Sequence, residues 1–190
     1  MRRVVQEPVK VVPYDPQWRE IFEREKGHLR RVLPEELIGR IEHFGSTAVP
    51  GLVSKPIVDM LVEVWDLEEI REIAPDILPL PRYDYFWRPT WGDDGPPFYA
   101  WFIKRNAAGE RTHHIHMIEP DFEHWDRLLF RDYLIDHPEI ARKYGELKER
   151  LAARHTDDRI AYTEAKGEFI TRITEEAKRF YGQPNENPSG

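Results

Sequence analysis

The chain has 190 residues, 40% of them hydrophobic and 12% aromatic, which is enough apolar side chain to bury the core of one domain. Its formal charge of −7 argues against a protein whose affinity comes mainly from neutralising a phosphate backbone, so we expect no strong nucleic-acid binding. Cysteine is absent, which excludes disulfides and thiol chemistry, and no run approaches the roughly 18 apolar residues of a membrane helix, so we expect no membrane partner.

The first part of the chain predicts a helix, two strands and a second helix. Asp15 offers an N-cap, Pro16 suits the first helical position, and Pro34 ends the helix. Apolar and β-branched runs separated by a turn-rich loop then predict strands. These elements are a strand over Ile38–Phe44, a strand over Ile57–Val64 and a short helix over Asp66–Ile77.

The second part predicts three strands and then helices. Aromatic and alternating segments on either side of a Gly/Pro loop at residues 89–97 predict antiparallel strands over Tyr83–Arg88, Phe98–Lys104 and Thr112–Glu119. Helical periodicity begins after Pro120, restarts at Pro138, and restarts after Asp158 to continue as far as Phe180. Helices thus flank a mixed sheet, which is the α+β fold class.

The chain contains no internal repeat, so we expect a single domain over residues 1–182. The polar, turn-forming segment 183–190 is expected to be a flexible C-terminal tail. The first eight residues lack the apolar run of a signal peptide, which predicts a cytoplasmic protein.

The loop after the first strand carries the chemistry. It opens with Gly45, Ser46 and Thr47, where a glycine permits close approach and backbone amides with a hydroxyl converge on an anion, which favours phosphate. The spacing is not that of a Walker A loop, because Gly51 falls one position late. The alternative is a turn that uses Gly and Pro for its geometry alone.

Asp59 interrupts a run of Ile, Val, Met and Leu, where a carboxylate is costly to bury unless something pairs with it. Functional carboxylates on such strands hold divalent cations. The alternatives are an ion pair with Lys55 or Arg40, or a position at the solvated edge of the sheet.

The stretch from His43 to Val64 resembles the signature of the GrpB family of bacterial proteins. The resemblance extends over nearly the whole domain, through the motifs Val12–Trp18, His114–His116, Leu128–Leu134 and Ala161–Lys166. That family is similar to the nucleotidyltransferase superfamily, and some relatives are fused to dephospho-CoA kinase. The resemblance therefore implies a nucleotidyltransferase-like fold and a link to coenzyme A metabolism.

Members of that superfamily hold phosphates with a Gly-Ser pair and bind catalytic magnesium with an acid-x-acid strand. The resemblance implies that Asp59 and Ser46 are the catalytic residues and that Asp59 holds the metal. Leu61 departs from the pattern, because it stands where the second carboxylate would be. The next acid on that face, Glu63, lies about 13 Å from Asp59 along the strand, too far to share two metals about 3.5 to 4 Å apart.

His114 and His116 alternate along a strand, so both rings point to one face, with roughly 7 Å between their Cβ atoms. If this strand lies beside the Asp59 strand, Asp59, His114 and His116 form a metal site in which imidazole favours zinc, manganese or iron over Mg²⁺. The alternative is that both histidines bond within a polar sheet face. His113 points to the opposite face and is expected at the surface.

The candidate cations for binding a triphosphate are Lys55, Arg88, Lys104, Arg131 and Lys166, of which Arg131 and Lys166 lie in the family motifs. The aromatic residues of the predicted hairpin either line a ligand cleft or serve the core. The residues implied to bind the nucleotide are Gly45, Ser46, Thr47, Lys55, Arg131 and Lys166.

The leading hypothesis is a metal-dependent nucleotidyltransferase that moves a nucleotidyl group from a nucleoside triphosphate to a small acceptor. Its cofactor is a divalent metal, Mg²⁺ first, with Mn²⁺ or Zn²⁺ as alternatives. A second hypothesis is a catalytically degenerate protein that binds a nucleotide or phosphorylated small molecule, which Leu61 favours. A third is a His-ligated metal hydrolase.

Overall fold

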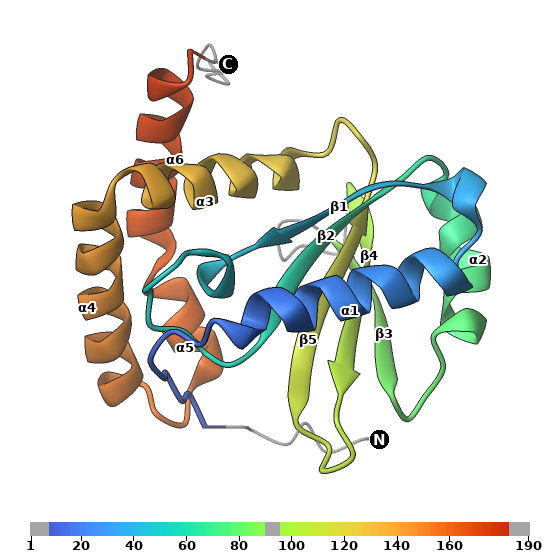
Figure 1. The fold of residues 1–190 in the computed structure, drawn as a ribbon, viewed down its shortest axis with the longest axis horizontal. Helices are drawn as coiled ribbons and strands as arrows, with labels where there is room; N and C mark the ends of the chain where they lie inside the picture. The colour runs from blue at the N-terminus through green and yellow to red at the C-terminus, as the bar shows by residue number, and fades with distance from the viewer. Residues whose placement is uncertain (1–7, 90–95, 183–190) are drawn as a thin grey trace. The chain divides into compact units, whose positions relative to one another are not determined.

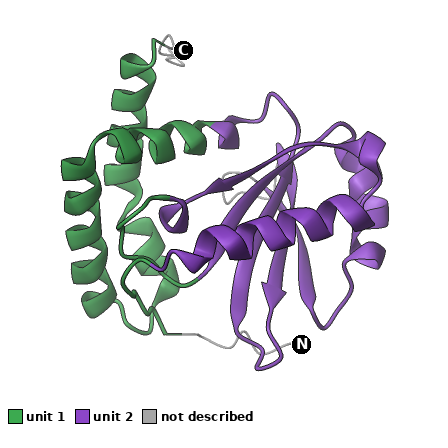
Figure 2. Cartoon of the chain, in the orientation of Figure 1, with its two compact units in different colours: residues 1–14, 49–56, 126–190 green, residues 15–48, 57–125 purple. Residues whose placement is uncertain are grey.

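The computed structural model describes residues 8–89 and 96–182. The chain forms two compact units (Figure 2): unit 1 holds residues 1–14, 49–56 and 126–190, and unit 2 holds residues 15–48 and 57–125. The prediction of a single domain over residues 1–182 stays a prediction. The predicted tail 183–190 and residues 90–95 of the predicted Gly/Pro loop lie outside the described residues.

Unit 2 contains the strands and two helices, and each predicted element is present with its ends within two residues of the prediction. Short 3₁₀ turns lie at Glu35–Leu37, Ser46–Ala48 and Glu123–Trp125. The longer elements are α1 Gln17–Val32, β1 Ile38–Phe44, β2 Val58–Val64, α2 Leu67–Ile77, β3 Tyr83–Pro89, β4 Phe98–Arg105 and β5 Arg111–Ile118.

The five strands form one mixed sheet in the order β1-β2-β5-β4-β3 (Figure 1). Neighbouring strands are antiparallel except β2 and β5, which are parallel. The three predicted strands of the aromatic region are indeed antiparallel neighbours. The expected α+β class with a mixed sheet flanked by helices is therefore confirmed.

Helices α1 and α2 both pack on the same face of this sheet. Asp15 Oδ1 accepts a hydrogen bond from Gln17 N at the start of α1, and the apolar side of α1 is buried against the sheet. Arg71 of α2 lies over the Trp87 ring, which shares that face. His113 also points to this face and is 5% exposed, so the prediction that it lies at the surface was wrong, because α1 covers it.

Unit 1 contains α3 Asp126–Asp136, α4 Pro138–Arg154, α5 Arg159–Glu164 and α6 Gly167–Phe180. The predicted last helix is thus divided in two, just before Gly167, a residue of low helix propensity. Buried Lys148 of α4 donates to the carbonyl of Val53 and ties the 49–56 segment to this helix. None of the helices in the described part of the chain is long and apolar enough to cross a bilayer.

Candidate functional site

The Gly45 turn follows β1 and faces Asp59 of β2. Phe44, the last residue of β1, pairs with Asp59, and Gly45 then takes a positive φ of 71° before the short turn at Ser46. A Cβ added at Gly45 would come within 2.5 Å of Asp59 Oδ2. Only glycine fits this position, so the structure places Gly45, the first residue of the turn, directly beside Asp59.

Thr47 anchors the turn from the opposite side. Its side chain is 1% exposed, and its Oγ1 lies 2.9 Å from Nε2 of His43, whose ring stacks on Phe22 of α1 with 4.9 Å between centroids. The Thr47 side chain therefore fixes the turn against the helix-covered face. Any contact of Thr47 with a nucleotide would have to come from its backbone.

Asp59 forms its hydrogen bond with a histidine on the next strand. Parallel pairing of β2 and β5 places Asp59 opposite His114, with 3.1 Å between Asp59 Oδ1 and His114 Nδ1. The side chains are 27% and 13% exposed, respectively, so the carboxylate reaches solvent. The condition on which the histidine site depended, that its strand lies next to the Asp59 strand, is therefore met. Arg40, one alternative partner, pairs instead with Glu63 at 3.2 Å.

His116 lies two residues further along β5 in an aromatic cluster. Its ring centroid is 5.4 Å from Tyr99, 5.5 Å from Phe44 and 6.1 Å from His124. Within residues 8–89 and 96–182, no group of three or more His, Asp or Glu side chains is arranged to hold a metal ion. The predicted three-ligand centre of Asp59, His114 and His116 is therefore not assembled, because packing with aromatic rings surrounds His116.

Of the two residues that follow Asp59 on its face of β2, one is a buried leucine and the other is an acid that pairs with Arg40. Leu61 is fully buried, and Glu63 accepts hydrogen bonds from the backbone N and from Nε of Arg40, whose guanidinium stacks on Trp125 at 3.7 Å. The Glu63 carboxylate thus links β2 to β1 through its hydrogen bonds with Arg40.

Glu42 of β1 pairs directly with Leu61, so its side chain shares the face of Asp59. Diagonal neighbours of this kind have Cβ atoms roughly 7 to 8 Å apart, within reach of a glutamate. Sequence reasoning missed Glu42, because its signal is strand alternation, which becomes informative only once the register is known.

The aromatic residues of β3 and β4 divide between the two faces of the sheet. Trp87 and Phe98 stack at 5.8 Å on the helix-covered face, whereas Phe86, Tyr99 and Trp101 point to the face of Asp59. Core packing is therefore present on the helix-covered face, whereas the lining of a ligand cleft by the rings on the face of Asp59 stays a prediction. Trp91 lies outside the described residues.

The three basic residues implied to bind the nucleotide, Lys55, Arg131 and Lys166, belong to unit 1. Lys55 and Lys166 both lie over the Tyr162 ring, with Nζ 5.4 Å and 4.4 Å from its centroid. Burial raises the pKa of Tyr162 to about 12, so the phenol stays neutral, and its 1% exposure shows that it packs. Arg131 pairs with its neighbour Asp132 at 2.7 Å. Unit 1 thus brings Lys55 and Lys166 together over the Tyr162 ring.

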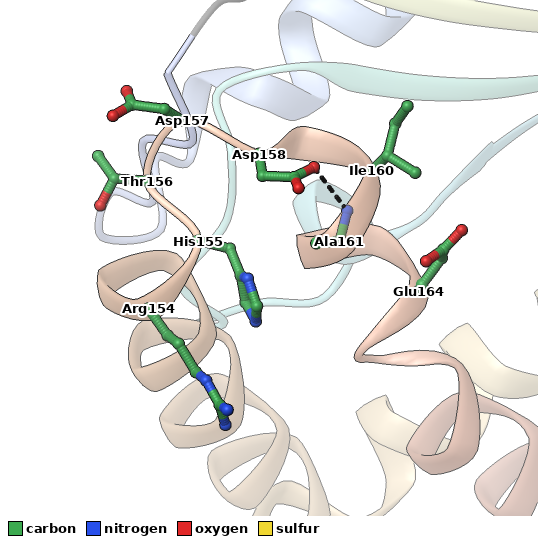
Figure 3. Close-up of a pocket in the computed structure, with 8 residues that line it drawn as sticks. All are labelled: Arg154, His155, Thr156, Asp157, Asp158, Ile160, Ala161 and Glu164. Carbon is green, nitrogen blue, oxygen red and sulfur yellow. Dashed lines mark hydrogen bonds between the residues drawn. The ribbon is translucent and has the colours of Figure 1, made fainter.

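Unit 1 also has an open hollow of about 740 Å³ between the end of α4 and α5 (Figure 3). None of the predicted site residues lines it. Its Asp158 carboxylate accepts from Ala161 N, as the dashed line in Figure 3 shows, and so caps α5. This carboxylate of the hollow is thus occupied in capping a helix, and we assign the hollow no function.

Comparison with known proteins supports the resemblance found in the sequence. The chain is 38% identical to UPF0157 protein YqkA of Bacillus subtilis over 95% of this chain and 51% of that protein. The crystal structure of conserved protein GrpB from Enterococcus faecalis superposes with a TM-score of 0.77 at 35% identity, covering 92% of this chain and all of that one.

A protein named dephospho-CoA kinase, from Mycolicibacterium paratuberculosis, is 25% identical over 87% of this chain and 45% of its own length. The chain therefore spans about half the length of both curated relatives named here, YqkA included. The resemblance implied that some relatives are fused to dephospho-CoA kinase, and this match to part of a protein of that name agrees with it. The profile described as "GrpB protein" matches residues 8–176, and the chain belongs to the GrpB family.

Proposed function

We propose that unit 2 is a metal-dependent nucleotidyltransferase that moves a nucleotidyl group from a nucleoside triphosphate to a small acceptor. The observation that carries this proposal is the approach of Asp59 Oδ2 to the Gly45 turn, so close that no side chain fits between them. Backbone amides of this turn and the Ser46 hydroxyl would then lie opposite a carboxylate, which is the arrangement needed to hold a phosphate and its counter-cation.

The residues around this position fit a magnesium ion better than a zinc ion. Magnesium keeps several waters and is commonly held by one or two carboxylates together with substrate phosphates, so three protein ligands are unnecessary. Asp59 would supply the first carboxylate and Glu42 the second, in place of the missing acid at Leu61. A bound divalent cation would offset the charge that develops on the phosphates. The absence of a three-ligand group among the described residues makes the zinc hydrolase the weaker alternative.

The chain's own groups would bind and orient the nucleotide. Backbone N–H groups of the turn and the Ser46 hydroxyl would donate to phosphate oxygens, and His114 would hold Oδ1 of Asp59 so that Oδ2 stays directed at the turn. In the reaction, the acceptor oxygen bonds to the α-phosphorus while the bond to the bridging oxygen breaks. Pyrophosphate leaves and the acceptor's proton passes to water. Positioning and charge stabilisation supply most of the rate in such transfers.

A second candidate function is nucleotide binding without turnover. Leu61, fully buried beside Asp59 on the same strand face, favours it because the acid-x-acid strand is incomplete. Coenzyme A precursors belong among the acceptors tested for the first candidate, because a relative is named dephospho-CoA kinase. Phosphorylated small molecules are the ligands that the second candidate would bind.

The two functions can be separated with α-labelled nucleoside triphosphates. The full chain is incubated with Mg²⁺ or Mn²⁺ and a low-molecular-weight metabolite extract or coenzyme A precursors, and transfer of label to a new product is followed. Calorimetry measures binding of the same nucleotides with and without metal. The transferase predicts metal-dependent binding and label transfer, and Asp59→Asn should abolish the transfer while the melting temperature is retained.

Asp84→Asn is the matched control, because Asp84 of β3 lies on the same sheet face but pairs with Arg105 at 2.7 Å. It should leave transfer unchanged. Binding without transfer, insensitive to metal and to Asp59→Asn, would favour the non-catalytic candidate. If the wild-type chain neither binds a nucleotide nor transfers label, both candidates are wrong.

A further inference from the structure

Trp101, Phe86 and Arg88 form a second surface on the sheet face that carries Asp59, and we call these three side chains the Trp101 platform. The Phe86 and Trp101 ring centroids are 5.3 Å apart, and the guanidinium carbon of Arg88 lies 5.0 Å from the Trp101 ring. Phe86 is 41% exposed and Arg88 is also exposed. An edge strand therefore presents an aromatic ring and a cation to solvent, with a half-buried indole beside them.

Trp101 also carries an unsatisfied polar atom. Its indole Nε1 is enclosed and finds no hydrogen-bond acceptor among the described residues. Enclosed indole N–H groups usually find a partner in the protein or an ordered water, so an unsatisfied donor calls for an explanation. Because this atom is enclosed, an acceptor of a bound molecule would reach it only after the side chains around it shift, whereas the exposed Phe86 ring is directly accessible to a planar ligand. The platform thus favours a planar ligand that carries acceptor atoms.

The platform lies within a nucleotide's reach of Asp59. Trp101 pairs with His116, which pairs with Leu61, so Trp101 is two strands across and two residues along from Asp59. Strand spacing and rise then place the two Cα atoms roughly 12 Å apart. The ring of His114, which bonds to Asp59, also meets the Trp101 ring edge to face at 5.4 Å. Side chains in mutual contact therefore lead from the carboxylate to the platform.

We propose that the Trp101 platform binds the base of the nucleotide, an inference that rests on the proposed function of Asp59 and the Gly45 turn. Every nucleobase has a π face, so stacking on aromatic side chains accepts purines and pyrimidines alike. Arg88 adds a cation that interacts with aromatic faces and donates to base acceptors. The ligand is thus a nucleotide recognised at both ends, and a bare phosphate chain would engage only one of them.

Calorimetry on the full chain with Mg²⁺ tests this by comparing nucleoside triphosphates with inorganic tripolyphosphate. Stacking of one base predicts that the wild type binds a nucleoside triphosphate about 10-fold or more tightly than tripolyphosphate. Trp101→Leu should remove that difference and leave tripolyphosphate binding unchanged. Trp101→Phe keeps a ring without the donor and should lose only part of it. Trp65→Leu, at a tryptophan that is 54% exposed, is the matched control and should bind as the wild type does.

Circular dichroism and the melting temperature establish that each variant is folded. If Trp101→Leu does not fold, Phe86→Leu and Arg88→Gln provide the same comparison at exposed positions. Equal affinity for nucleoside triphosphates and tripolyphosphate in the wild type overturns the platform but leaves the phosphate site standing. If tripolyphosphate does not bind, the binding of unphosphorylated nucleosides is measured instead. Nucleoside binding that Trp101→Leu weakens would support the platform, even though the phosphate site would then be wrong. No binding of nucleosides then overturns the platform as well.

Discussion

Gly45 meets two separate demands of the candidate site. Its φ of 71° lies in the left-handed region, which costs other residues about 1 to 2 kcal/mol, and its missing side chain leaves room for the Asp59 carboxylate. The first demand belongs to any tight turn. The second arises because the carboxylate of the neighbouring strand fills the space, as the Glu63 carboxylate also does beside Gly39.

We expect Gly45→Ala to lower the free energy of unfolding by about 3 kcal/mol, the sum of backbone strain and the clash with Asp59 Oδ2. Gly109→Ala is the matched control, since Gly109 has a φ of 82° and an added Cβ meets nothing within 4 Å. That variant should lose only the backbone cost of about 1 kcal/mol. Urea unfolding of both variants measures the difference.

A double variant isolates the contact with Asp59. Removing the carboxylate in Asp59→Ala should make the additional Gly45→Ala change cheaper, approaching the cost at Gly109, because the two residues then no longer overlap. If Gly45→Ala costs the same with and without Asp59, the turn and the carboxylate are not coupled. The observation that carries the proposed function would then lose its meaning.

At the scale of elements, α1 packs on the sheet through a buried polar network. Glu25 of α1 is 3% exposed, accepts from Tyr83 Oη at 2.7 Å and forms an ion pair with Lys104. Desolvation raises the pKa of Glu25, but hydrogen bonds from Lys104 and Tyr83 outweigh it and leave the pKa below its usual value. His113 of β5 lies beside this network, and burial lowers its pKa to about 4.

These shifts predict that the protein loses stability on mild acidification. Between pH 6.5 and about 4 the unfolded chain binds a proton at His113 that the folded chain does not bind. The free energy of unfolding therefore decreases as the pH is lowered through this range. The pKa difference corresponds to at most about 3 kcal/mol over that window. The contribution of Glu25 is lost only at lower pH, below the ordinary carboxyl pKa of 4.5.

Urea unfolding at several pH values between 4 and 7 should therefore show a shallower decline for His113→Asn than for the wild type. His155→Asn, at a histidine in unit 1 between α4 and α5, serves as the control and should keep the wild-type slope. Parallel declines in all three proteins would mean that His113 does not remain neutral in the folded state.

At the scale of the whole molecule, local patterns predicted the elements but not their pairing. Alternation and turn residues located the strands within two residues, because these signals act over a few neighbours. The order β1-β2-β5-β4-β3 depends on contacts distant in sequence. The Asp59 and His114 pair could therefore be expected only on the condition that their strands are neighbours.

Burial was the second quantity that the sequence did not provide. His113 was expected at the surface from strand alternation, and the alternation was right, but a helix lies over that side of the sheet. Glu25 interrupts the apolar stripe of α1 and is buried through partners on β3 and β4, which no pattern within the helix indicates. Glu42 and the division of the aromatic rings likewise required the register.

The charge of the whole chain supports a last prediction. With 35 acidic and 28 basic residues, the molecule as a whole repels a polyanion, although Lys55 and Lys166 gather locally around Tyr162. Two such cations would release about two counterions from DNA, whereas nucleic-acid-binding proteins with 6 to 10 phosphate contacts owe several orders of magnitude in affinity to that release. Fluorescence anisotropy with a labelled DNA duplex should therefore show no saturable binding at micromolar protein and physiological salt. Saturable binding with a steep salt dependence would contradict the prediction and reveal a basic surface much larger than this pair.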